Sequence, residues 1–156
     1  MQGVSISLVK LREIPAVRRQ FIDAIHGSFR YISPAYSDKI LQHNSLLRLY
    51  GSHFRPDRSI AVARNGGRVI GYAIGGITGG LANLFWLYVD PSYRGQQIGL
   101  KLLQFFCDEC QNKGATKIAL STYDHEEFYK QFGFITLDEQ ELHGVPMKIM
   151  QLELIS

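Results

Sequence analysis

Between an apolar run and a helical pattern, the chain carries a short polar segment with two glycines, Arg94-Gly95-Gln96-Gln97-Ile98-Gly99. The run before it, Leu84–Val89, is too short for a helix and predicts a strand buried on both faces. Pro91 has no N–H to donate to a sheet ladder, so the strand ends before it. The first N–H groups of the helix that follows lack partners and carry the positive end of its dipole. The arrangement therefore predicts an anion site that suits a phosphate.

This segment resembles the acyl-CoA-binding motif of the GNAT superfamily of N-acetyltransferases, which reads R/Q-x-x-G-x-G/A after a strand that ends in V-x-P. Arg94, Gly95 and Gly99 lie at matching positions, and Val89–Pro91 supplies the end of the strand. Gln97 stands where the pattern usually has its first glycine. This departure would weaken cofactor binding only if the residue needs a positive φ.

A second element of the same family, F-Y-x-x-x-G-F, is matched by Phe128–Phe134, about thirty residues downstream. The resemblance covers residues 59–154, and residues 1–58 by layout alone. It implies an N-acetyltransferase that moves an acetyl group from acetyl-CoA to a primary amine of an unidentified small molecule or peptide by direct attack. It also implies Tyr129 as general acid for the departing sulfur, and no metal.

The resemblance also implies where acetyl-CoA would lie. Its diphosphate would rest on the N–H groups that follow Arg94, whose side chain would add positive charge or simply lie at the surface. Backbone groups of the preceding strand would pair with the pantetheine amides, and one N–H would polarise the thioester carbonyl. The implied cosubstrate-binding residues are Leu87, Tyr88, Val89, Arg94, Gly95, Gln96, Gln97, Ile98, Gly99 and Leu100.

The sequence does not determine how the departing thiolate is protonated or which group deprotonates the amine. Full proton transfer from a tyrosine of pKa about 10 to a thiolate of pKa about 8.5 is uphill by about 2 kcal/mol. Tyr129 therefore needs a depressed pKa or acts mainly by hydrogen bonding. Alignment places Asn83 where several family members carry an acid, and an amide is no base. The remaining base candidates, each of which also suits a solvated surface or a helix cap, are Asp124, His125, Glu126, Glu127 and His53. A low-pKa amine or a chain of waters would make a protein base unnecessary.

The acceptor pocket of this family is built largely by the first two helices and the last hairpin. Here these segments contribute aromatic, histidine and methionine side chains at Phe29, Tyr31, Tyr36, His43, Tyr50, His53, Phe54, Met147 and Met150. Such a lining favours an aryl or aliphatic amine over a polyphosphorylated one, and no acidic cluster indicates a polyamine. The acceptor itself stays open.

Hydrophobic periodicity predicts the elements that hold these residues. Strands are expected at Met1–Val9, Ser59–Arg64, Arg68–Thr78, Leu84–Val89, Lys117–Tyr123, Phe134–Leu142 and Met147–Leu154. Helices are expected from Pro15 to Phe29, from Ile40 to Gly51, from the motif to Gly114, and over Glu126–Phe132, with a loop at Tyr31–Tyr36 and turns at Asn65-Gly66, Gly79-Gly80 and His143-Gly144. This order predicts an α+β fold with a mixed, mostly antiparallel sheet of six or seven strands flanked by about four helices. It matches the GNAT layout, in which the central strand and the strand after the motif helix splay apart.

Length, charge and hydropathy limit the expected number of domains, the expected partners and the expected location of the protein. With 156 residues, 17 basic against 14 acidic side chains and a net charge of +3, the chain predicts a single domain over residues 1–156 with no obligate nucleic-acid partner. No apolar run reaches the roughly 18–20 residues that span a bilayer, and the N-terminus alternates like a strand, so we expect a cytoplasmic protein without a membrane partner. A homodimer is left open.

Cys107 and Cys110 form a single C-x-x-C motif, which by itself would indicate a redox or metal site. They share one helical face with Leu103 and Phe106, which predicts core thiols in a reducing compartment instead. The glycine spacing excludes the phosphate loop of NTPases, and no dinucleotide fingerprint is present. The serious alternative to an enzyme is a non-catalytic CoA-binding sensor or interaction module on the same fold.

Overall fold

The structure is a computed structural model in which residues 3–28, 34–142 and 144–154 are described. The described residues form one seven-stranded sheet in the order β1-β2-β3-β4-β5-β7-β6. Its strands are β1 (Val4–Leu8), β2 (Arg58–Asn65), β3 (Arg68–Thr78), β4 (Leu81–Val89), β5 (Lys117–Thr122), β6 (Ile135–Leu142) and β7 (Val145–Glu153). Every neighbouring pair is antiparallel except β4 and β5, which are parallel. The predicted α+β fold is confirmed.

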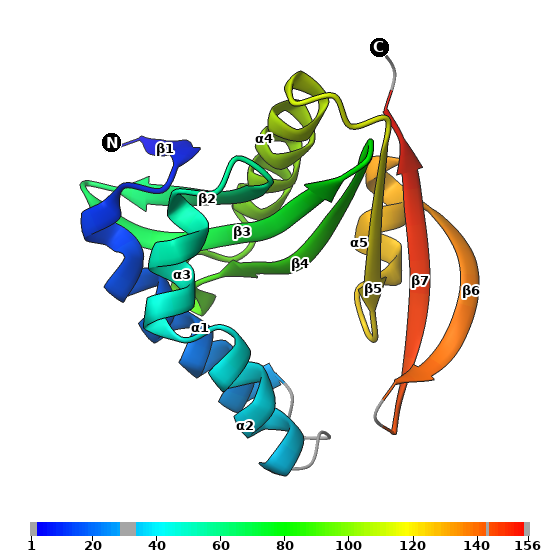
Figure 1. Ribbon diagram of the computed structural model, residues 1–156, viewed down its shortest axis with the longest axis horizontal. Coiled ribbons are helices and arrows are strands. Elements are labelled where there is room, and N and C mark those ends of the chain that lie inside the picture. Colours follow the sequence, from blue (N-terminus) through cyan, green and yellow to red (C-terminus); the bar gives the residue numbers. More distant parts are fainter. Residues whose placement is uncertain (1–2, 29–33, 143, 155–156) are drawn as a thin grey trace.

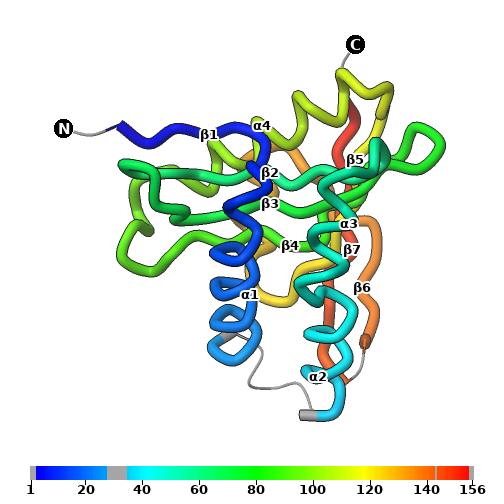
Figure 2. Tube along the Cα trace, turned by 60° about the vertical axis from the view of Figure 1, so that its left-hand side comes forward, coloured from blue at the N-terminus to red at the C-terminus, as the bar shows by residue number. Residues whose placement is uncertain are grey.

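Helices cover both faces of this sheet (Figures 1 and 2). They are α1 (Ile14–Ser28), α2 (Pro34–His43), α3 (Leu46–His53), α4 (Ile98–Asn112) and α5 (Glu126–Phe132), with short 3-10 turns at Leu11–Glu13 and Pro91–Tyr93. The first three stand together on one face, where Phe21 of α1 packs edge-on against Trp86 of β4. On the other face, α4 and α5 share a second core that includes Phe106 and Tyr129.

Three predicted elements differ in the structure. The second expected helix is split into α2 and α3, because Ser45 caps a new helix by accepting a hydrogen bond from the Arg48 N–H. That third helix ends at His53, beyond the expected Gly51, and α2 begins at Pro34, inside the expected loop. The first hairpin turns at Gly66-Gly67 with φ of 59° and 85°, one residue later than Asn65-Gly66. His143, in the last expected turn, lies outside the described residues.

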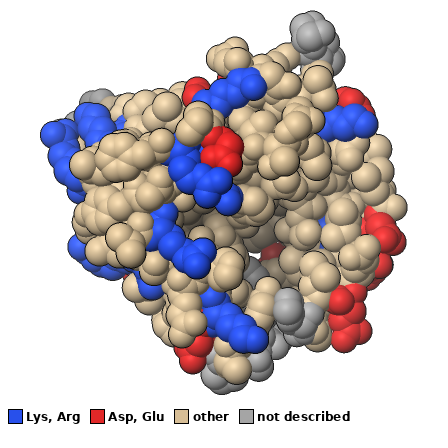
Figure 3. Space-filling view, in the orientation of Figure 1, with Lys and Arg blue, Asp and Glu red and all other residues tan. Residues whose placement is uncertain are grey.

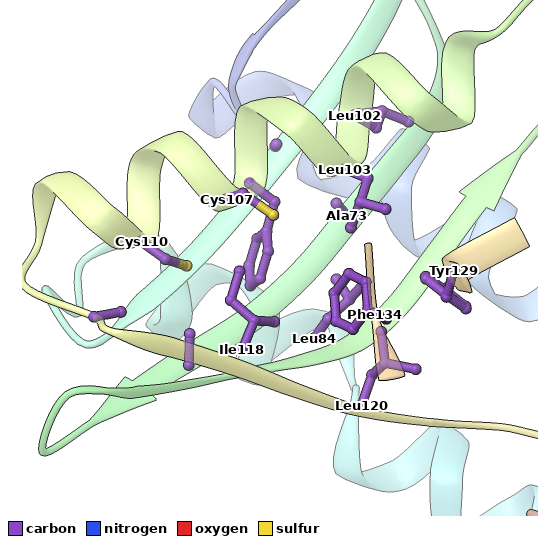
Figure 4. Close-up of a cluster of buried hydrophobic side chains, with 14 of the residues drawn as sticks. Ala73, Leu84, Leu102, Leu103, Cys107, Cys110, Ile118, Leu120, Tyr129 and Phe134 are labelled. Atoms are coloured by element: carbon purple, nitrogen blue, oxygen red, sulfur yellow. The ribbon is translucent and has the colours of Figure 1, made fainter. Parts of the chain in front are cut away.

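The prediction that both cysteines are core thiols is confirmed. Cys107 and Cys110 are free thiols that point from α4 into the core, with 3% and 0% of their surface exposed (Figure 4). Burial raises the pKa of each to about 12, with the neighbouring Cys110 adding to the effect at Cys107. A buried thiol of raised pKa is a poor nucleophile, and both residues lie in the apolar core under α4, where they serve packing.

A buried ion pair ties the N-terminal segment to the sheet. The Arg64 guanidinium on β2 donates to both carboxylate oxygens of Glu13, and also to the Ser7 hydroxyl and the Leu8 carbonyl. Burial alone would raise the pKa of Glu13, but hydrogen bonds from Arg64 and the Lys10 N–H, with the charge of Arg64, hold it below its usual range. The pair fixes β1 and the start of α1 against β2.

Candidate active site

The sheet opens along the seam between its two parallel strands. β4 and β5 pair at three positions, from Leu81 with Lys117 to Asn83 with Ala119, and then separate although both strands continue. Figure 1 shows the two strands together at one end and apart at the other. The expected splay of the central strand is therefore present. The expectation that Leu84–Val89 is buried on both faces is wrong, because this whole segment lies beyond the last pair with β5 and Phe85 is 48% exposed.

A cavity of about 1140 Å³ occupies the opening. Its walls come from the C-terminal half of β4, the residues after β5, helices α2 and α3, and the start of β7. It is visible as the central hollow of the space-filling view (Figure 3). A cavity of this size, bordered by an unpaired strand edge, can hold an extended ligand that pairs with the strand.

The backbone of β4 presents alternate residues to this opening. The Asp90 N–H donates to the Ile70 carbonyl of β3, and Tyr88 lies opposite Tyr72 in the same ladder. In an antiparallel pair, every second residue bonds to the partner strand, so the N–H and C=O groups of Leu87 and Val89 point toward the seam. Tyr88, the middle residue of the predicted Leu87–Val89 set, has its backbone directed to β3 instead.

A β-bulge sits in the middle of the open part of β4. Gly75 pairs with Leu84 and Ile74 with Trp86, so Phe85 is an extra residue without an opposite partner. A bulge of this kind turns a side chain out of the regular alternation and is common beside active sites. It explains why Phe85 lines the cavity next to Trp86 and Leu87.

The predicted phosphate segment forms the loop before α4 and its first turn. Gln97, just before the helix, has φ 63° and ψ 19° and is the single non-glycine residue with a positive φ among those described. Gln97 thus replaces the family's usual glycine at a position whose backbone conformation favours glycine. A Cβ on Gly99 would lie 3.5 Å from the Phe128 ring and 3.8 Å from Val89, so glycine keeps open a space between β4 and α5. Free N–H groups of a helix start beside this space fit a diphosphate.

Arg94 is directed back toward the strand. Its Nε donates to the Val89 carbonyl at 3.0 Å, and its guanidinium lies 5.6 Å from the centre of the Tyr88 ring. This contact satisfies one backbone acceptor at the open edge of β4. The remaining guanidinium N–H groups stay exposed at the phosphate segment, so both of the roles considered for Arg94 fit its position.

Tyr129 projects from α5 and lines the cavity while 8% of its surface is exposed. Its ring packs edge-on against Phe128 and Phe134, and Figure 4 shows it at the edge of the α4 core. Burial, and to a lesser extent the charge of Asp124, raises the pKa of Tyr129 above its usual value. Of the two alternatives for this tyrosine, burial favours a protonated hydrogen-bond donor over a hydroxyl of depressed pKa.

The candidates for a general base are scattered. Asp124 and His125 line the cavity and approach each other at 3.2 Å between Oδ1 and Nε2. Glu126 accepts a hydrogen bond from Thr136, and Glu127 is 83% exposed beside Lys130.

Asn83 and His53 do not line the cavity either. Asn83 lies in the paired part of β4, and His53 packs edge-on against Phe54.

Some of the residues expected at the acceptor pocket line the cavity, and others lie away from it. Tyr36, His43 and Met147 line the cavity. Met150 belongs to the core, Phe54 faces solvent, and Tyr50 packs beside the α1 core. Phe29 and Tyr31 lie outside the described residues. The basic side chains on the cavity wall were not predicted from the sequence; they are Lys39, Arg48, Arg55 and Arg58. A lone basic residue on a predicted helix or strand gives no sign that it faces a site.

The described residues contain no group of three or more His, Cys, Asp or Glu side chains that could hold a metal ion. None of the helices in the described ranges is long and apolar enough to cross a membrane.

An open parallel seam, a helix start suited to a diphosphate and a buried tyrosine are features that fit an extended, phosphate-bearing ligand. The family model of the acetyltransferase (GNAT) domain matches residues 56–136. The chain therefore belongs to the GNAT family and is an acetyl-CoA-dependent acetyltransferase.

Individual relatives agree with this family. IAA acetyltransferase of Azospirillum brasilense is 29% identical over 121 residues, which cover 74% of each chain. The structure of PaiA N-acetyltransferase from Thermoplasma acidophilum in complex with coenzyme A matches with a TM-score of 0.77 and 20% identity, over 97% of this chain and 99% of that one. Ribosomal-protein-S18-alanine N-acetyltransferase from Escherichia coli gives a TM-score of 0.73 and 19% identity, over 97% and 94%. The names of the Azospirillum and Escherichia proteins indicate different acceptors, so the fold alone does not identify the acceptor here.

Proposed function

We propose that this protein transfers the acetyl group of acetyl-CoA to a primary amine of a small molecule or peptide by direct attack, in a single domain over residues 1–156. The observation that carries the proposal is the open seam beyond Asn83, with Tyr129 on the wall of the cavity it creates. The coenzyme A held by the structurally similar PaiA supports acetyl-CoA as cosubstrate.

The phosphate end of acetyl-CoA would rest on the N–H groups between Gly95 and Leu100, with Gly99 leaving room for close approach. When bound, acetyl-CoA supplies a thioester carbonyl that an amine can attack. Along β4, Leu87 and Val89 direct backbone groups toward the seam, where they would pair with the pantetheine amides. A backbone N–H of this edge would also stabilise the negative charge that develops on the carbonyl oxygen.

Tyr129 would act at the sulfur as charge develops there. Its raised pKa keeps the hydroxyl protonated at neutral pH, so it is a standing hydrogen-bond donor. Because the pKa of a thiol is about 8.5, complete transfer of the tyrosine proton is even less favourable than the sequence indicated. We therefore assign Tyr129 to stabilisation of the thiolate by a hydrogen bond, with solvent supplying the proton afterwards.

A direct test measures thiol release from acetyl-CoA across a panel of primary amines, with mass spectrometry of the acetylated product. We expect amine-dependent release and an N-acetylated product for at least one amine class. Acetyl-CoA should also raise the melting temperature, whereas ATP and NAD should not. Binding of acetyl-CoA without turnover of any amine would contradict the proposal and point to the non-catalytic module.

A further inference from the structure

The wall of the cavity on the α2 and α3 side carries an excess of positive charge. Four basic side chains line it, against a single acidic one, Asp124, at the opposite end near β5. The four are Lys39 on α2, Arg48 on α3, Arg55 after α3 and Arg58 at the start of β2. Figure 3 shows Lys and Arg side chains on the left-hand side of the hollow, with a few acidic side chains among them and others at the right-hand edge of the molecule.

One of these cations is already paired. Arg55 forms a bidentate ion pair with Asp57, at 3.0 Å and 2.7 Å between the guanidinium nitrogens and the carboxylate oxygens. Among the described residues, no carboxylate pairs with Lys39, Arg48 or Arg58. The wall therefore retains a net positive charge that a ligand can neutralise, and it disfavours a polycationic acceptor.

Arg58 is the cation that the fold holds in place. Its register partner on β3 is Gly76, where an added Cβ would lie 3.1 Å from the Arg58 Nη1 and 3.5 Å from its Cδ. The glycine thus lets the arginine side chain run flat across β3. The guanidinium ends 5.6 Å from the centre of the Phe85 ring, over the bulge in the open part of β4. It is thereby fixed beside the strand that would carry the acetyl donor.

A fixed guanidinium in a half-buried aromatic site is suited to a carboxylate. Arginine offers a planar fork of N–H donors that matches the two carboxylate oxygens, and charge-assisted bonds of this kind are stronger than neutral ones. Contact with an aromatic ring leaves the edge of the fork free while it orients the plane. The rest of the cavity wall, with Tyr36, Trp86 and Leu87, offers apolar surface to the body of the ligand.

We propose that the acceptor of this acetyltransferase is an amino carboxylate with an apolar body, and that Arg58 binds its carboxylate while the amine faces β4. The proposal rests on the function proposed above. Lys39 and Arg48, which are exposed, add to the positive field that draws the acid into the cavity. Arg58 is a binding residue in this scheme and takes no part in bond making.

The test compares ω-amino carboxylates of increasing length, together with 4-(aminomethyl)benzoate, each against the corresponding neutral primary amide. For at least one length we expect the acid to be preferred 10- to 100-fold in kcat/KM, as a charge-assisted bond to arginine provides. R58M should remove this preference by raising KM for the acid, so that acid and amide are turned over with similar kcat/KM, while the melting-temperature shift with acetyl-CoA stays the same. R19Q, which removes an exposed arginine of α1 away from the cavity, is the matched control and should keep the preference.

Three outcomes would separate the claims. Turnover of amides as fast as of the matched acids at every length would overturn the carboxylate proposal and leave the acetyltransferase function intact. A preference for acids that survives in R58M would overturn the role of Arg58. Absence of turnover with every acid and every amide would overturn this inference together with the proposed function.

Discussion

Asn83 of β4 and Ala119 of β5 form the last pair of the parallel ladder, and beyond them the two strands carry on without each other. The separation exposes one edge of β4 between Leu84 and Val89, the segment that holds the bulge at Phe85. An unpaired strand edge inside a protein leaves backbone groups without partners, which is costly unless a ligand or water satisfies them. The position of this last pair therefore sets where a ligand can add itself to the sheet.

Tyr129→Phe tests the mechanism. The change keeps the ring that packs against Phe128 and Phe134 and removes the hydroxyl, so the melting temperature and its shift with acetyl-CoA should stay the same. We expect kcat to fall roughly 10²-fold or more, with KM little changed, because the lost interaction forms as charge develops on sulfur. Steady-state kinetics against Tyr93→Phe, which removes a hydroxyl that accepts a bond from Asn65, provides the control. A loss of only a few-fold would make Tyr129 structural.

The raised pKa of Tyr129 also predicts a pH profile. A tyrosine whose pKa lies above its usual value of about 10 stays protonated through the alkaline range. The rate should therefore show no descending limb from tyrosine ionisation up to about pH 10, measured as kcat with a primary amine of low pKa that stays deprotonated over the whole range. A limb near pH 8 or 9 that disappears in Tyr129→Phe would mean that the hydroxyl ionises far more easily than its burial implies.

Gln97→Gly tests backbone strain at the phosphate segment. A non-glycine residue in the left-handed region costs about 1–2 kcal/mol, so glycine should stabilise the free protein by up to about 1 kcal/mol. For a chain of this length that corresponds to a rise in melting temperature of about 2–4 °C. Gln96→Gly, on the neighbouring residue without a positive φ, is the control and should not stabilise.

Gly99→Val tests the space kept open between β4 and α5. The side chain would occupy the room beside Phe128 and Val89 and block close approach to the helix start. We expect the melting-temperature shift produced by acetyl-CoA to shrink by at least half, as measured by differential scanning fluorimetry over a ligand titration. An undiminished shift would place the diphosphate elsewhere.

Glu13→Gln tests the buried ion pair through its pH dependence. The pKa of Glu13 is lower in the folded chain than its ordinary value near 4.5, so the carboxylate stabilises the fold above that pH. At pH 7 the variant should lose about 3–5 kcal/mol, because Arg64 is left buried without its partner. The difference between wild type and variant, measured by urea unfolding, should narrow as the pH falls below about 4.5. A difference that does not change with pH would show that the charge of Glu13 contributes nothing.

Replacing both Cys107 and Cys110 by alanine tests their assignment to the core. Each lost sulfur leaves a small cavity, so stability should fall by roughly 1 kcal/mol per residue. The turnover per folded molecule should remain within about two-fold of wild type. Loss of activity in a variant of unchanged stability would give the thiols a functional role.

Features that depend on neighbouring residues in the chain could be predicted from the sequence. The glycine-containing segment after Pro91, the helix that starts beyond it and the position of Tyr129 next to Phe128 are local patterns. The same is true of the buried face with Cys107 and Cys110, because a period of 3.6 residues fixes which side chains lie together on a helix. These patterns were enough to predict the family and the mixed sheet. They failed at Ser45, where one polar residue caps a new helix within a continuous hydrophobic pattern.

Tertiary structure decided the features that join distant segments. Arg58 reaches Phe85 only because β2, β3 and β4 pair in a register that places Gly76 between them. The same dependence on register sets the last pair of β4 and β5, and the alternation that turns Leu87 and Val89 toward the seam. The left-handed backbone of Gln97 could not be predicted from its residue type, because glutamine ordinarily avoids that conformation. Here the loop between the strand and the helix imposes it. Sequence fixes which groups are available, and the packing of elements far apart in the chain fixes which of them meet.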